Sequence, residues 1–244
     1  MSIAIRPVLA DAWSLFRRDR DWLLRVAGPF LFLPAFALAL LVPSAPVAFL
    51  SGAGSSEADA LARAARLTGW VRAYGGWHLL ANALGLFGAA ALQSAYLDGE
   101  ARDVRAALAR AGTLLPRYLI AMLLIALPTG AGLYLWVLPG LYVMGRTLLV
   151  GPVLVAERPV SALGALGRSF ALSRGLGMPM MALAATSLLG ALLLAQPFAA
   201  LAPVAGRGAV AAVAAATGLA AAATLGTIAQ VLIAVCAYRR LGSR

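Results

Sequence analysis

Hydrophobic residues fall into long runs along this chain, separated by short stretches that carry nearly all of the charge. Six runs are long enough to cross a hydrocarbon core, for which a helix needs about 20 apolar residues. They cover residues 26–50, 77–97, 118–137, 138–156, 176–201 and 209–238, and a Leu138-Pro139-Gly140 break opens the fourth. Four prolines in the first run are expected to kink it or end it early. The pattern predicts an all-α polytopic bundle of about six transmembrane helices, forming a single integral membrane domain over residues 1–244.

Three of the polar stretches show the periodicity of amphipathic helices, at residues 1–25, 98–117 and 157–175. Their apolar positions are Ile5, Val8, Leu9, Ala12, Leu15 and Phe16, then Val104, Ala107, Leu108, Ala111, Leu114 and Leu115, and lastly Val160, Leu163, Leu166 and Phe170. Such faces predict interfacial helices that lie on the inner leaflet with arginines toward lipid phosphates. Ordinary connecting loops with chance periodicity are the alternative.

The order of these stretches predicts a possible three-fold internal repeat of one amphipathic helix followed by two spans. Residues 107–111 match residues 165–169 in part, which favours the same division. The outer loop is predicted at residues 51–76, beginning with a flexible Gly/Ser linker. Within it, Glu57 to Trp70 is expected to form a short surface helix capped by Ser55 or Ser56.

Composition excludes the soluble and disordered classes. The chain is 62% hydrophobic and 12% charged, with a mean hydropathy of +0.89. Average soluble domains are about 45–50% apolar and about 25% charged, and disordered chains are less hydrophobic still. The single cysteine, Cys236, excludes a disulfide framework within the chain and a cysteine-based zinc site.

Charge predicts the orientation. The net charge is +11, and all 20 basic residues are arginine. Fifteen of them lie on one side of the predicted spans, namely Arg6, Arg17, Arg18, Arg20, Arg25, Arg102, Arg105, Arg110, Arg117, Arg158, Arg168, Arg174, Arg239, Arg240 and Arg244. The positive-inside rule then places both termini in the cytoplasm. The same rule explains the high positive charge, so no nucleic-acid partner is predicted. The Arg-only, Ala-rich usage is typical of a GC-rich genome and indicates a bacterial source. The expected location of such a multi-pass protein is the bacterial inner membrane.

The N-terminal segment is expected to be retained in the mature protein. A cleaved signal peptide has a short basic start and a 7–15-residue apolar core. Here Asp11, Asp19 and Asp21 lie among the first arginines, and the apolar run that follows is longer than such a core.

Residues that carry chemistry are sparse. His78 stands alone, and the apolar runs hold no carboxylate well inside them, so no catalytic residues, metal site or cofactor is predicted. Arg146 is the one charge well inside a run. Its two interpretations are a structural one, by snorkelling or by bonding to exposed carbonyls, and a functional one, as a pocket for an anionic headgroup.

The stretch from Leu138 to Gly175 resembles a known family. It combines Leu138-Pro139-Gly140, Gly151-Pro152, a terminal Glu157 and an Ala-Leu-x-x-Ser pattern that ends at Gly175. This resembles the membrane domain of bacterial glycerophosphoryl diester phosphodiesterases and its stand-alone, YciC-like inner-membrane relatives. The resemblance implies structural roles for Pro139, Gly140, Pro152, Glu157, Ser169 and Gly175. The soluble catalytic barrel of the phosphodiesterases has no counterpart in these 244 residues, so hydrolase activity is not expected.

Function is predicted at the level of class. The first hypothesis is a non-catalytic scaffold or regulatory partner in envelope or lipid physiology. The second is a transporter or lipid-handling protein with an anionic-headgroup pocket at Arg146. Arg146, Arg168 and Arg174 are the candidate ligand or lipid contacts, and the expected partners are membrane lipids with anionic headgroups on the cytoplasmic face.

Overall fold

A computed structural model of the protein describes residues 4–43, 45, 56–98, 103–205 and 209–242. These residues form helices and connecting turns, without a strand among them. The helical elements are α1 (Ile5–Ala27), the π-helical turn η1 (Gly28–Phe32), α2 (Leu33–Leu41), α3 (Glu57–Leu97), α4 (Val104–Leu135), α5 (Val137–Thr147), α6 (Val150–Ala156), α7 (Ala162–Leu172), α8 (Gly177–Ala205) and α9 (Ala209–Gly242). The predicted all-α class is confirmed.

Six helical stretches are long and apolar enough to cross a membrane. They are Ile5–Leu41, Glu57–Leu97, Val104–Leu133, Val137–Ala156, Gly177–Leu201 and Val210–Gly242. Large apolar side chains point outward from them; Leu79, Leu127 and Leu193 are each more than 70% exposed. Exposed leucines in such number, on helices of this length and hydropathy, are typical of surfaces that face lipid. The chain is therefore a multi-pass membrane protein.

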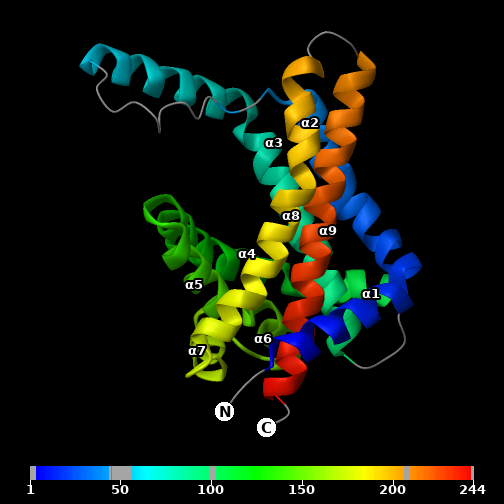
Figure 1. Cartoon of the computed structure of the whole chain (residues 1–244). Coiled ribbons are helices and arrows are strands. Elements are labelled where there is room, and N and C mark those ends of the chain that lie inside the picture. The colour runs from blue at the N-terminus through cyan, green and yellow to red at the C-terminus, as the bar shows by residue number, and fades with distance from the viewer. Residues whose placement is uncertain (1–3, 44, 46–55, 99–102, 206–208, 243–244) are drawn as a thin grey trace.

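Helices α8 and α9 form an antiparallel hairpin at the centre of the bundle (Figure 1). Helix α2 and the second half of α3 pack beside this hairpin, and α4 and α5 form a second hairpin. Helix α1 begins and α9 ends at the same end of the bundle, which we call the terminal end (Figure 1). The last turn of α8 and the first turn of α9 lie at the opposite end, as six crossings require (Figure 1).

The first span is one helical path with a π-turn in it. Pro29 lies at the start of η1 and Pro34 at the start of α2, where the missing N–H groups interrupt the regular α-helical bonding. Helix α2 ends at Leu41, two residues before Pro43. The prediction that prolines distort this run or end it before residue 50 is confirmed as far as the described residues reach; Pro46 lies outside them.

Two of the three amphipathic stretches continue directly into spans. Helix α1 leads through η1 into α2, and α4 runs through Pro116 and Pro128 without a break. Their apolar faces pack onto the bundle, because Val8 and Ala111 are fully buried. Residues 99–102 of the predicted stretch 98–117 lie outside the described part. Helix α7 alone is a separate element, and it leaves Leu163 exposed. The order of elements keeps the layout of the predicted repeat, and the repeat itself stays a prediction.

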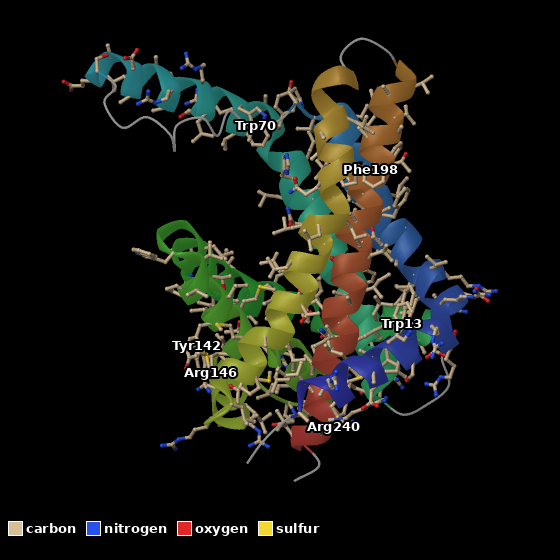
Figure 2. The ribbon with its side chains drawn as sticks, in the orientation of Figure 1. Trp13, Trp70, Tyr142, Arg146, Phe198 and Arg240 are labelled. Atoms are coloured by element: carbon tan, nitrogen blue, oxygen red, sulfur yellow. The ribbon has the colours of Figure 1, made fainter. Side chains whose placement is uncertain are left out.

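Glycines allow the closest helix contacts. A Cβ at Gly226 would lie 2.5 Å from the Ala191 Cβ, and the Phe198 ring occupies the place of a side chain at Gly218 (Figure 2). Both contacts join α8 to α9. Small residues at these positions let the two helix backbones approach closely.

The predicted outer loop 51–76 is helical from Glu57 onward. Helix α3 starts there and continues without interruption into its span, so its first part extends away from the bundle (Figure 1). Ser56 forms the capping box, because its hydroxyl accepts from the Asp59 N–H while the Asp59 carboxylate accepts from the Ser56 N–H. Trp70 ties this part to the end of the first span by donating to the Pro43 carbonyl at 3.0 Å. The surface helix that was expected to be short is thus the first third of a 41-residue helix.

Substituting Ser56→Ala is expected to fray the start of α3. The change removes an acceptor for a terminal N–H group, a loss that costs about 1 kcal/mol in typical N-caps. Amide hydrogen exchange at residues 57–62 should rise about fivefold, since 1.4 kcal/mol is about tenfold in an equilibrium. Thr68→Ala, in the same exposed helix, is the matched control, because the Thr68 hydroxyl bonds only to its own helix. Equal exchange in both variants would contradict the cap.

Candidate functional site

Arg146 joins the last turn of α5 to the end of α7. Its guanidinium donates to the Ser173 carbonyl and, at 3.1 Å, to the Phe170 carbonyl, and it lies 5.1 Å from the centre of the Phe170 ring. In return, the Ser169 hydroxyl donates to the Arg146 carbonyl at 2.7 Å. Figure 2 shows Arg146 near Tyr142 at the level of α7. We call Arg146, Ser169, Phe170 and Ser173 the Arg146 clasp.

The clasp caps a helix. Phe170 lies in the last turn of α7 and Ser173 is its C-cap, so both carbonyls lie at the negative end of the helix dipole. A guanidinium suits this place, since it offers several donors and a positive charge. The Ser173 carbonyl also accepts from the Leu176 N–H at 3.0 Å, so the guanidinium adds to the bonding of this turn. Of the two sequence-based interpretations of Arg146, this geometry matches the structural one, by bonding to carbonyls, and the carbonyls belong to a neighbouring helix end.

The other two candidate arginines have separate surroundings. Arg168 donates from Nε to both carboxylate oxygens of Glu157, at 3.1 and 2.9 Å, while Arg174 is exposed in the turn after α7. Among the contacts of the described residues, none joins two of the three arginines to a common group. Their role as lipid contacts stays a prediction.

Glu157 links three helices at the terminal end. Besides Arg168 of α7, it accepts a hydrogen bond of 3.1 Å from the Tyr238 hydroxyl of α9. Of the three arginines that follow it in the sequence, Arg158, Arg168 and Arg174, the ion pair is with Arg168. Arg158 instead pairs with Asp98, at 3.1 Å.

The remaining motif residues occupy turns and packing contacts. Gly175 has a φ of +74° in the turn that follows α7, a conformation that favours glycine. Pro152 is buried in α6. Gly140 is buried where α5 crosses α4; a Cβ there would lie 2.7 Å from the Leu133 Cα. Pro139, one residue before it, is exposed.

A cavity with a volume of about 650 Å³ lies between the helices, and its lining includes Met144 and Thr147 but not Arg146. Residues of α2, α3, α4, α9 and the α5–α6 segment line it. One end is closed by Gln93, Tyr118 and Thr147, which are all buried. Towards the other end the lining includes Asn82 and Ala223, which are exposed. Along each helix the buried residues lie nearer the terminal end, so the cavity opens toward the opposite end.

Polar but uncharged side chains are part of this lining. Gln93 is 5% exposed and accepts from the Tyr118 hydroxyl at 3.4 Å. Gly151 permits this placement, because a Cβ there would lie 2.7 Å from the Gln93 Nε2. Helix α9 contributes Thr224, Thr227 and Gln230. The rest of the lining is mainly aliphatic, so the cavity suits a molecule with a small polar part and an apolar part.

Sequence reasoning did not identify these polar residues as a site. The signal that would have found the cavity is their spacing. Asn82 and Gln93 are eleven residues apart, as are Tyr118 and Thr129, and eleven residues are about three helical turns. Each pair therefore lies on one face of its helix, and only packing decides that the two faces meet.

Metal-ligating groups are not gathered among the described residues: no three His, Cys, Asp or Glu side chains lie together. His78 packs against Trp70, with ring centres 5.0 Å apart.

Comparison of the chain with protein-family models, with curated proteins and with solved structures found no match. The resemblance to the phosphodiesterase membrane domain stays a prediction.

Proposed function

We propose that this multi-pass membrane protein is a lipid-handling protein or transporter that holds a membrane-borne molecule in its central cavity. The cavity is the observation that supports the proposal. Its volume of about 650 Å³ falls within the range of about 300–1,000 Å³ that ligand sites occupy. It lies between helices at the level of the spans, where transporters bind their substrates. The proposal contains no catalytic step.

The scaffold hypothesis explains the cavity less well. A scaffold acts through its outer surface, and tight packing of its interior costs it nothing. In this protein the helices pack closely at glycines such as Gly145 and Gly226, yet they leave a wide cavity between them. In its lining the Thr129 hydroxyl is buried without a partner among the described residues, and such a group destabilises a bundle unless a ligand or water satisfies it. We therefore place the proposed ligand site in the cavity and not at Arg146.

The proposed orientation places the terminal end at the cytoplasmic face of a bacterial inner membrane. Arg110, Arg158, Arg168 and Arg240 lie in ion pairs with Asp98, Glu157 and Asp11 around that end. An excess of arginine on this side supports the orientation by the positive-inside rule. The cavity then opens toward the outer leaflet.

The test is to block the cavity from its mouth. Ala223→Trp places a large ring at an exposed lining position of α9, whereas Ala214→Trp puts the same ring on an exposed position of α9 outside the lining. Both proteins are extracted in mild detergent, and the retained lipids are identified by native mass spectrometry. The wild type and Ala214→Trp are expected to carry the same lipid, and Ala223→Trp to lose at least about nine-tenths of it, since tenfold corresponds to 1.4 kcal/mol. Equal lipid in both variants would contradict the proposal.

A further inference from the structure

We infer that the cavity takes a ligand whose buried polar part is uncharged and bears hydroxyl groups, of the kind that a monoacylglycerol or a simple glycolipid presents. This inference rests on the proposed function and names its substrate class.

Charge is the first step of the argument. The residues that line the cavity include no Asp, Glu, Arg or His. The nearest candidate cation, Arg146, is held by the carbonyls of Phe170 and Ser173. A phosphate or ammonium group would enter this space without a counter-charge, and burying an unpaired ion is strongly unfavourable. The cavity therefore selects against charged headgroups.

Hydrogen-bonding capacity is the second step. The hydroxyls of Thr147, Thr224 and Thr227 donate to carbonyls of their own helices, at 2.9, 2.7 and 3.0 Å. Because each hydroxyl proton is already donated, the threonine oxygens can only accept hydrogen bonds from a ligand. The Asn82 amide likewise donates to the His78 carbonyl at 2.7 Å and leaves its own carbonyl oxygen to accept.

Donors also face the cavity. The Gln93 carbonyl oxygen accepts from Tyr118, which leaves the amide N–H groups of Gln93 to donate at the closed end. The Thr129 hydroxyl is buried without a partner in the described part of the chain, and Gln230 adds a second amide to the lining. A space with both acceptors and donors matches ligand hydroxyls, because each hydroxyl donates one hydrogen bond and also accepts. A carbonyl-only or ether-only headgroup accepts from these donors but has no proton to donate to the threonine oxygens.

The apolar lining fixes the remainder of the ligand. Leu31, Leu38, Met122 and Ile125 surround the polar groups with aliphatic surface. An acyl or alkyl chain buries this surface favourably, at about 0.8 kcal/mol per CH₂ group. The lining therefore favours a ligand that carries both hydroxyl groups and an aliphatic chain.

Three probes with the same chain separate the possibilities. They are 1-decanoylglycerol, its 3-phosphate, and its 2,3-di-O-methyl ether. Binding to the purified, delipidated protein is measured by native mass spectrometry over a concentration series. We expect the diol to bind about tenfold more tightly than either analogue, because each analogue loses hydrogen bonds or brings an unpaired charge.

Variants locate the binding. The double variant Thr224→Val, Thr227→Val is expected to weaken diol binding about tenfold and to leave ether binding unchanged. Thr217→Val, an exposed threonine of α9 outside the lining, is the matched control. The probe series uses the wild-type protein, so it decides the inference even where a variant does not fold.

The outcomes distinguish the inference from the proposed function. Equal binding of all three probes, or tightest binding of the phosphate, each blocked by Ala223→Trp, would overturn the inference and leave a ligand cavity in place. Absence of binding by all three probes, or binding that Ala223→Trp does not affect, would overturn both.

Discussion

Substitution of Gly145 by alanine is expected to break the contact between α5 and α8 and to cause the largest loss of stability among the single changes considered. A Cβ at Gly145 would lie 2.5 Å from the Met181 backbone nitrogen and 2.7 Å from the Met180 carbonyl carbon. These atoms belong to a helix backbone, which cannot rotate away as a side chain can. The two helices must separate, and overpacking of this kind costs about 3 kcal/mol or more.

Thermal unfolding in detergent, followed by circular dichroism, measures this loss. The midpoint is expected to fall by about 6–12 °C, taking about 2–4 °C per kcal/mol for a chain of this size. Gly190→Ala in α8 is the matched control, because a Cβ there meets no atom within 4 Å. It should change the midpoint little, or raise it through the better helix propensity of alanine. A midpoint in Gly145→Ala equal to that of the control would show that α5 and α8 do not pack as described.

Replacement of Arg146 by alanine is expected to release the end of α7. The change removes the donors to the Phe170 and Ser173 carbonyls and the contact with the Phe170 ring. Hydrogen bonds to charged groups contribute about 1.5–3 kcal/mol each, so the variant should lose about 3 kcal/mol. Amide exchange over residues 162–176 should rise more than elsewhere. Arg146→Lys should recover part of the stability, since an ammonium replaces the charge but not the two-pronged geometry.

Lipid binding separates this structural role from the pocket hypothesis. Arg174→Ala, at an exposed arginine two residues beyond the end of α7, serves as the control. We expect anionic lipids that co-purify with the protein to be unchanged in Arg146→Ala relative to Arg174→Ala. A stable Arg146→Ala protein that loses one specific anionic lipid would reinstate Arg146 as a ligand contact.

The spans were predictable because a hydrocarbon core imposes one simple requirement, a long apolar helix. That requirement can be read from residues 77–97 or 176–201 without knowledge of their neighbours. The continuity of helices was less predictable. A helix that starts at Glu57 and another within residues 98–117 were expected, but α3 and α4 carry these helices without a break into the spans. Polar helix formers continue a helix in water as readily as apolar ones do, so the apolar run alone does not mark where the helix ends.

The candidate site was predictable only in its parts. Gly175 and Glu157 were identified from the sequence. In the structure Gly175 lies in a turn with positive φ, and Glu157 forms an ion pair with Arg168. Arg146 was singled out because a charge in an apolar run is costly, but its partners lie 24 and 27 residues further along the chain. The residues around Arg146 in the sequence do not indicate that the end of α7 will lie beside it.

By itself, the sequence determined the class of protein, the number of spans and the side on which most arginines lie, because each depends on local hydropathy and on position along the chain. Only the tertiary structure decided what Arg146 does and where a ligand is to be sought. Both depend on which helix faces meet. Glycine contacts such as Gly145 against Met181 and Gly151 against Gln93 bring α5, α6, α8 and α3 together, and the space left among Gln93, Thr147 and Thr224 follows from that packing.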